Sequence, residues 1–290
     1  MRSLYLTGNV AVSMVREGIK IRTGDEARVW SPPYFPYDTI LIENGYGYVS
    51  FAALRILLSL RASVAVLDYQ GRLLGHMSPY SRRSGDIQTK QFRAVNDPKK
   101  RLRIARSIAT TGYRRRGLNP PFSAADNPLE LIRMESHVAD SYWERWSERL
   151  AAVWPENDFD GRKHPRYGTR MRAVSRVNAT LNYAYTLLQS ACRTTCHRVG
   201  LSPLHGFLHL SQIHDAEPLV YDLEELGRGW VDGAVLEWLS EPGNRKGFSR
   251  RDGWVVRLKP ESVRSLVAFV SPRIRDEILL RDARSIVKRL

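Results

Sequence analysis

The sequence predicts an α+β protein, in which an N-terminal β-sheet domain is followed by a larger, mainly α-helical domain. Its 290 residues are 43% apolar, which suffices for a sizeable core. The first 76 residues are rich in β-branched side chains, and Gly, Pro, Asn and Asp separate the apolar runs. Beyond about residue 80, apolar residues recur at spacings of three and four, which is typical of helices.

Short strands and a single helix are expected in the first part. Residues 51–60 carry Leu54, Leu57 and Leu58 at helical spacing, so one helix is predicted within the sheet domain. The expected strands are Leu4–Leu6, Ala11–Val15, Ile19–Arg22, Ala27–Trp30, Thr39–Ile42 and Ser63–Leu67.

The second part is predicted to hold long helices over residues 88–111, 128–152, 171–199 and 219–239. Asn127 and Pro128 supply an N-cap and a first-turn proline to the second of these. Asp252 and Gly253, next to an apolar run, predict a late β-hairpin. The predicted organisation is therefore a β-rich domain over 1–80, a basic linker over 81–88 and a helical domain over 89–290.

The charge points to a polyanionic partner, with nucleic acid as the leading candidate. The net charge is +15, and residues 82–116 contain twelve basic against two acidic residues. A second basic stretch, 162–198, contains no Asp or Glu. Solvated helix faces are the alternative explanation for both. The residues of the second stretch expected to contact DNA phosphates are Arg162, Lys163, Arg166, Arg170, Arg172 and Arg176.

The compartment follows from cysteine usage and from the lengths of the apolar runs. The two cysteines, Cys192 and Cys196, lie one helical turn apart and form no disulfide framework, so the cytoplasm is the expected compartment. The pair is interpreted as core cysteines rather than metal ligands. The longest apolar runs are interrupted by charges, so neither a membrane span nor a signal peptide is expected.

A carboxylate lies on the apolar stripe of the predicted helix 128–152. Glu135 occupies the position between Leu131 and Val138 that an apolar residue should fill. Because burying an unpaired carboxylate is costly, Glu135 requires a cation, a metal ion or a strong donor. A neighbouring arginine would satisfy it as well as a metal would.

Further ionisable residues crowd between Leu201 and Leu226. Asp222 and Glu225 are three residues apart on one edge of a predicted helix, and a cation between them is one interpretation. Together with Glu135 and His209 they would form a carboxylate-rich set with one imidazole, which favours Mn²⁺ or Mg²⁺. A zinc pair of His205 and His209 is disfavoured by the intervening glycine.

The order of several segments resembles the CRISPR-associated adaptation integrases, the metal-dependent nucleases that insert spacers into a repeat array. The resemblance covers nearly the whole chain. The segments that carry it are Val177-Asn178-Ala179-Thr180-Leu181-Asn182-Tyr183-Ala184-Tyr185, Val199-Gly200-Leu201-Ser202-Pro203, Gly206-Phe207-Leu208-His209 and Val220-Tyr221-Asp222-Leu223-Glu224-Glu225. Glu135 and Ser136, followed by Tyr142 and Trp143, resemble a further family pattern, with Ser136 where Gly is usual.

By this resemblance Glu135, His209 and Glu225 are the metal ligands, and Asp222 is a nearby catalytic residue that holds or orients the ion. Asn178 and Tyr183 are added to the DNA-contacting candidates. The implied reaction is transesterification, in which a 3′-hydroxyl of a short donor duplex attacks a phosphate of the repeat target.

The implied partners are a second copy, joined through the sheet edge in residues 3–76, and a small ferredoxin-like CRISPR-associated protein. Two alternatives remain at this point: a non-catalytic basic DNA-binding module, and a metallohydrolase of small phosphorylated substrates.

Overall fold

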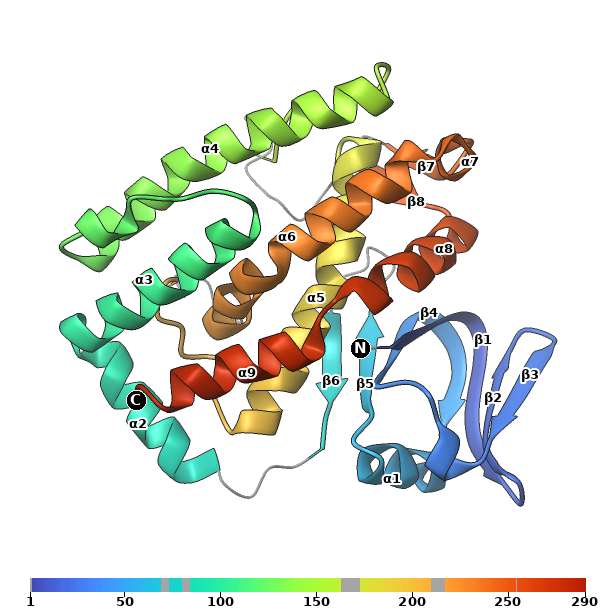
Figure 1. Cartoon of the computed structure of the whole chain (residues 1–290). Coiled ribbons are helices and arrows are strands. Elements are labelled where there is room, and N and C mark those ends of the chain that lie inside the picture. The colour runs from blue at the N-terminus through green and yellow to red at the C-terminus, as the bar shows by residue number, and fades with distance from the viewer. Residues whose placement is uncertain (1, 69–72, 80–83, 163–172, 210–216, 254) are drawn as a thin grey trace.

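The computed structural model confirms the predicted fold class: a mixed sheet at one side and a larger helical part at the other (Figure 1). It describes residues 2–68, 73–79, 84–162, 173–209, 217–253 and 255–290. In those residues no helix is long and apolar enough to cross a membrane.

The sheet has six strands in the order β3-β2-β1-β4-β5-β6. β1 pairs in parallel with β4, as β4 does with β5, and the other pairs are antiparallel. The two strands predicted over residues 4–15 are one, because Gly8 takes a φ of 78° at an irregularity in the β1–β4 pairing and the strand continues. The strands are β1 (Ser3–Val15), β2 (Gly18–Thr23), β3 (Glu26–Trp30), β4 (Thr39–Val49), β5 (Ser63–Leu67) and β6 (Leu73–Met77).

The two faces of the sheet belong to different cores. Ile40 and Val64 face α1 (Phe51–Ser59), the predicted helix of this part. Leu41 and Ala65, the next residues along the same strands, belong to the core of the helical part. This alternation is the period of two of a strand. The residues of the predicted domain 1–80 therefore share one of their cores with the helical part.

The helical part starts earlier than expected and has one more break. Ser84 opens α2, so residues 84–88 of the predicted linker are helical, whereas 81–83 lie outside the described residues. The helix predicted over 88–111 is two helices, because Asp97 caps the backbone N–H groups of Lys99 and Lys100 and Pro98 begins a new helix. The helices are α2 (Ser84–Asn96), α3 (Pro98–Arg115), α4 (Pro128–Val153), α5 (Arg176–Val199), α6 (Pro218–Ser240), α7 (Pro242–Arg245), α8 (Pro260–Val270) and α9 (Asp276–Val287).

The predicted cap of α4 is confirmed, because Asn127 accepts a hydrogen bond from the Glu130 N–H at the start of this helix. The helix predicted over 171–199 begins only at Arg176, because Ser175 caps α5 by accepting from the Asn178 N–H. The late hairpin is confirmed as β7 (Ser249–Asp252) and β8 (Val255–Leu258). Strand β6 and helices α7, α8 and α9 were not predicted individually.

Close helix contacts bring α3 and α6 together. Gly112 of α3 lies where an added Cβ would be 2.5 Å from the carbonyl oxygen of Glu225 on α6, so a glycine is required for this approach. α4 packs on both α3 and α6 (Figure 1). Two consecutive helices, α3 and α4, thus meet the distant helix α6 around one small region.

A polar contact also joins the sheet to α5. The hydroxyls of Tyr5 on β1 and Tyr183 on α5 both donate to the carboxylate of Glu43 on β4. Burial raises the pKa of Glu43, although both hydroxyls act in the opposite direction. This junction is therefore built around a buried carboxylate.

Candidate metal centre

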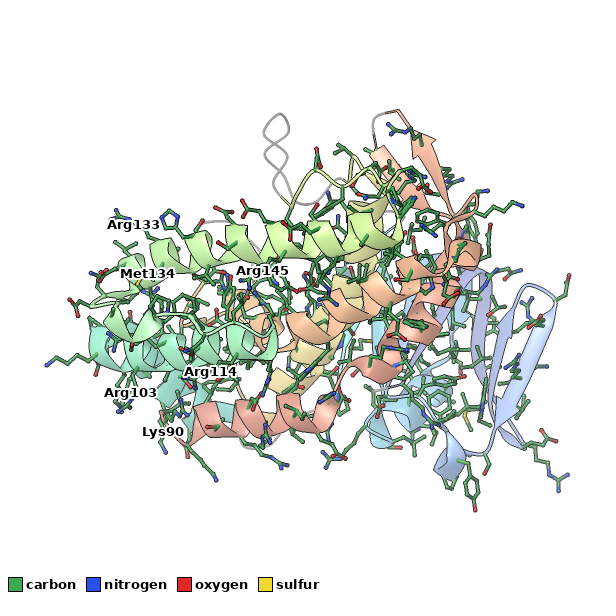
Figure 2. All side chains as sticks on the ribbon, turned by 45° about the horizontal axis from the view of Figure 1, so that its top comes forward. Lys90, Arg103, Arg114, Arg133, Met134 and Arg145 are labelled. Carbon is green, nitrogen blue, oxygen red and sulfur yellow. The ribbon has the colours of Figure 1, made fainter. Side chains whose placement is uncertain are left out.

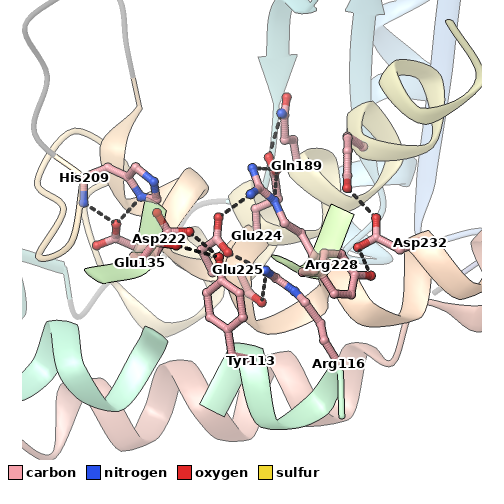
Figure 3. A network of polar contacts seen from close by, with 12 residues as sticks. Tyr113, Arg116, Glu135, Gln189, His209, Asp222, Glu224, Glu225, Arg228 and Asp232 are labelled. Carbon is pink, nitrogen blue, oxygen red and sulfur yellow. Dashed lines mark hydrogen bonds and ion pairs between the residues drawn. The ribbon is translucent and has the colours of Figure 1, made fainter. Parts of the chain in front are cut away.

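His209 is held in place by the buried carboxylate of Asp222. Asp222, on α6, accepts hydrogen bonds from the backbone N–H groups of Phe207, Leu208 and His209 at 2.5, 3.1 and 2.9 Å. Its Oδ1 also lies 2.9 Å from Nδ1 of the His209 ring (Figure 3). Burial lowers the pKa of His209, but the contact with Asp222 outweighs it and the net shift is upward.

This arrangement leaves the other ring nitrogen of His209 available. With Nδ1 at the carboxylate, Nε2 makes no hydrogen bond within the part of the chain that the structure describes. A carboxylate behind the imidazole is the usual arrangement that orients a metal-ligating histidine. Asp222 is thus placed to orient His209, and the interpretation of a cation bridging Asp222 and Glu225 gains no support.

Glu225 lies one turn further along α6 and is buried between two arginines. Its Oε2 accepts a 2.5 Å contact from Arg116 of α3, and its Oε1 lies 2.6 Å from Nη1 of Arg228. Burial opposes ionisation, but Arg228 and then Arg116 lower the pKa of Glu225 to about 2. Glu225 is therefore an ionised carboxylate inside the protein.

The two oxygens of Glu225 are not equally satisfied. The Arg116 contact is a hydrogen bond as well as an ion pair. Oε1 is buried and, despite its short distance from Arg228, makes no well-aligned hydrogen bond within the described residues. The short distance shows that Arg228 and Glu225 Oε1 attract each other as charges. The poor angle shows that the contact is not a hydrogen bond.

Glu135 on α4 has the strong donor that its place on the apolar stripe requires. The hydroxyl of Tyr113, on α3, donates to its Oε1 at 2.5 Å (Figure 3). Burial raises the pKa of Tyr113, and the charges of Glu135 and Glu225 add to that effect. Tyr113 is fully buried, and its hydroxyl lies close to both carboxylates.

The structure brings His209, Glu225 and Glu135 to the same region, as Figure 3 shows, although it does not assemble them as a ligand set. In the described residues, no three His, Cys, Asp or Glu side chains already form a metal-binding group. The donor set itself suits Mg²⁺ or Mn²⁺. It offers two carboxylates and an imidazole, and among the described residues neither Nε2 of His209 nor the buried Oε1 of Glu225 has an aligned hydrogen-bond donor or acceptor. The residues present therefore fit such an ion.

The predicted DNA-contacting residues have several different environments. Lys163, Arg166, Arg170 and Arg172 lie outside the described residues. Arg162 donates to the side-chain oxygens of Asn178 and Asn182 at 2.6 and 3.0 Å, so the two amides orient this guanidinium.

Two further DNA-contacting candidates are committed to protein contacts. Arg176 pairs with Asp158 at 3.2 Å and lies over the ring of Trp154. Tyr183 is 9% exposed and bonded to Glu43, which places it at the junction with the sheet. Their DNA contacts remain predictions that this placement does not favour.

The basic surplus of residues 82–116 is divided between the surface and the interior. Figure 2 shows Lys90, Arg103 and Arg114 extending from α2 and α3, and these are exposed. In contrast, Arg101 donates to the carbonyl of Phe207 at 2.9 Å, and Arg115 pairs with Asp282 at 2.7 Å. Together with the buried side chain of Arg116, these partly buried arginines show that DNA phosphates do not account for all of this charge.

The residues rejected as metal ligands at the sequence level have structural contacts. His205 lies in the loop before His209, where its ring packs edge-on against Phe92, so the two histidines share no helix face. Both cysteines are buried in α5 as free thiols.

The sequence analysis did not identify Tyr113, Arg116 and Arg228 as residues of this site. The sequence signal that could have indicated them is Gly112, a glycine that permits close helix packing.

Relatives of this chain carry names that agree with one another. The sequence model of a family described as CRISPR associated protein Cas1 matches residues 4–116 and 113–271. "CRISPR-associated endonuclease Cas1 2" of Pyrobaculum aerophilum is 30% identical over 250 residues, which cover 78% of this chain and 79% of that protein. "CRISPR-associated endonuclease Cas1 1" of Archaeoglobus fulgidus is 25% identical over 268 residues, covering 79% and 76%.

Solved structures share the fold. A casposase bound to integration product matches with a TM-score of 0.85 and 23% identity over 100% of this chain and 92% of that one. A Cas1 protein from Thermotoga maritima matches with a TM-score of 0.81 and 17% identity over 99% and 96%. A chain of a Cas6-RT-Cas1–Cas2 complex matches with a TM-score of 0.75 and 16% identity over 99% and 35%. Because the family match extends from the sheet through α8, this chain belongs to the CRISPR-associated protein Cas1 family.

Proposed function

We propose that this protein is a metal-dependent DNA endonuclease and integrase that inserts short DNA fragments into a CRISPR repeat array. Its membership of the Cas1 family, relatives named as endonucleases and a structural neighbour bound to an integration product support the proposal. The observation that carries it is His209: its Nδ1 is fixed by Asp222, its Nε2 makes no hydrogen bond to the described residues, and it lies in the same region as Glu225 and Glu135 (Figure 3).

Three side chains would hold the ion: His209 through Nε2, Glu225 through Oε1, and Glu135 through its carboxylate. A bound Mg²⁺ or Mn²⁺ would supply charge stabilisation to the phosphate that undergoes exchange. Asp222 keeps the imidazole in one orientation, and Tyr113 limits the rotation of the Glu135 carboxylate.

The proposed chemistry exchanges one phosphodiester for another. A 3′-hydroxyl of the donor duplex loses its proton and forms a new bond to a repeat phosphate, while the existing bond from phosphorus to a repeat 3′-oxygen breaks and that oxygen is protonated. With water as the nucleophile, the same site cleaves DNA. Exposed cations such as Lys90, Arg103 and Arg114 supply phosphate contacts (Figure 2).

The proposed assembly is a homodimer joined through the β-sheet, together with a small ferredoxin-like CRISPR-associated partner. Strand β3 supports the first part, because it is an edge strand whose residues Glu26–Val29 are exposed and an uncovered edge favours pairing. Sedimentation of the protein with and without the partner tests both. The cytoplasm remains the predicted location.

The deciding experiment is a strand-transfer and cleavage assay on a supercoiled plasmid that bears a repeat. The protein is supplied with a short 3′-hydroxyl duplex and with Mn²⁺, Mg²⁺ or a chelator, and DNA binding is measured in parallel. Glu135→Gln, His209→Ala and Glu225→Gln should each abolish nicking and insertion while DNA binding is retained, and the chelator should have the same effect on the wild type.

Glu237→Gln is the matched control, because Glu237 is also on α6 but its side chain is 60% exposed and pairs with Arg273. This variant should keep wild-type activity. Strong DNA binding with no product under any metal, also after the small partner is added, would favour the non-catalytic DNA-binding module instead.

A further inference from the structure

Arg228 contacts two carboxylates on its own helix, and only one of them is in the proposed metal-ligand set. Its Nη2 lies 2.8 Å from Oε1 of Glu224 and its Nη1 lies 2.6 Å from Oε1 of Glu225 (Figure 3). Its Nε also donates to Glu224, at 2.9 Å. The guanidinium thus makes two contacts with Glu224 and one shorter contact with Glu225.

The contact with Glu225 is the less well aligned of the two. Glu225 Oε1 has no aligned hydrogen bond in the described residues, whereas Glu224 receives one from Arg228 and another, at 2.8 Å, from the side-chain amide of Gln189 on α5. Glu224 is therefore held in place from both sides. It remains a defined partner for Arg228 if the contact with Glu225 is broken.

Arg116 provides the contrast. Its side chain is 2% exposed, stacks on the ring of Tyr113 at 4.3 Å, and donates to both the carbonyl and Oε2 of Glu225. The Arg228 side chain is 17% exposed and lies over the ring of Tyr185 at 5.4 Å. Arg116 therefore fixes one oxygen of Glu225, and Arg228 covers the other from a less enclosed position.

We propose that Arg228 is a positioning residue that covers Glu225 Oε1 in the metal-free protein and passes wholly to Glu224 when a divalent cation binds. The inference rests on the proposed metal-dependent function. A buried carboxylate without a counter-ion is unfavourable, so Arg228 keeps the empty site stable. A divalent cation and a guanidinium repel each other at short distance. The ion therefore binds at Glu225 only when Glu224 holds the Arg228 guanidinium away from that oxygen.

The two residues are then expected to change metal affinity in opposite directions. Arg228→Met removes the competing cation and should tighten Mn²⁺ binding about tenfold, the order of one charge-assisted contact. Glu224→Gln removes the alternative anion, leaves Arg228 with Glu225 and should weaken Mn²⁺ binding by a similar factor, about tenfold. If Arg228 and Glu224 only stabilised the fold, the two variants would not change Mn²⁺ affinity in opposite directions.

The measurement is Mn²⁺ titration of the DNA-free protein, followed by the electron paramagnetic resonance signal of free Mn²⁺. Arg273→Met is the matched control, since Arg273 also pairs with a glutamate of α6, Glu237, on the exposed side. Its Mn²⁺ affinity should equal that of the wild type. Glu224→Gln is nearly isosteric and keeps the test informative where Arg228→Met does not fold.

His209→Ala separates the two levels of inference. If the wild type binds Mn²⁺, His209→Ala abolishes binding and both α6 variants match the wild type, then the role of Arg228 is refuted while the metal site stands. Weakened binding in both α6 variants also refutes it. If neither the wild type nor Arg228→Met binds Mn²⁺, the metal site and the role of Arg228 fail together.

Discussion

His76 makes the stability of this protein depend on pH in a way that can be calculated. Its ring stacks on that of His197 across the contact between β6 and α5, with centroids 6.0 Å apart, and both of its nitrogens are buried without a hydrogen-bond partner in the described residues. Burial, followed by the charges of Arg193 and His197, lowers the pKa of His76 to about 4.

Because the folded pKa is lowered, the unfolded chain binds more protons than the folded chain between pH 4 and the ordinary histidine value of 6.5. The free energy of unfolding is therefore fully retained above pH 6.5 and decreases as the pH falls toward 4. Each tenfold difference in proton affinity corresponds to about 1.4 kcal/mol, so the complete loss is about 3 kcal/mol. About 2 kcal/mol of this is lost between about pH 7.5 and about pH 5.

Urea unfolding of the wild type and of His76→Leu at these two pH values measures the effect. The variant should lose about 2 kcal/mol less than the wild type on acidification, since leucine fills the buried position and binds no proton. His137→Leu is the control, because His137 is exposed on α4, and it should follow the wild type. An unchanged pH dependence in His76→Leu would refute this account of the buried imidazole.

Two substitutions test the packing around the proposed site. Gly112→Ala should lower the free energy of unfolding by about 1–3 kcal/mol, because the new methyl group meets the carbonyl of Glu225 at 2.5 Å. Gly233→Ala on α6, which has nothing within 4 Å, should instead raise the melting temperature, and a fall of the same size in both variants would contradict the close-approach argument. Tyr142→Phe removes the 2.6 Å donor to the fully buried Asp232 and should cost about 1–3 kcal/mol in urea unfolding. A cost below about 0.5 kcal/mol would mean that this carboxylate is satisfied without it.

Elements with local signals were predictable to within a few residues. α4 begins at Pro128 as expected, because the cap and the proline specify a helix start without any distant contact. The break between α2 and α3 at Asp97 and Pro98 was not predicted. The apolar residues on both sides keep one helical spacing, which favoured a single continuous helix. The continuous strand through Gly8 was missed because its partner, β4, is distant in the sequence.

In the candidate metal centre, too, local sequence signals identified some residues, and contacts between distant segments decided their partners. Glu135 was singled out by its place on an apolar stripe, and in the structure this half-buried carboxylate has a strong donor. That the donor is Tyr113 could not be read from spacing, since it lies on another helix. The same is true of Arg116, whose charge was counted with the surface surplus although it is buried against Glu225.

The sequence by itself determined the fold class, the N-terminal cap of α4, the late hairpin, and a set of carboxylates and one histidine suited to a divalent cation. These follow from composition and from periods of two to four residues, which act over short distances along the chain. Only the tertiary structure decided that Asp222 orients His209, that Glu225 lies between two arginines, and which cations of the basic segments face solvent. The physical reason is that charge pairing depends on distance in space, and the helices that bring Arg116 within 2.5 Å of Glu225 are separated by more than 100 residues of chain.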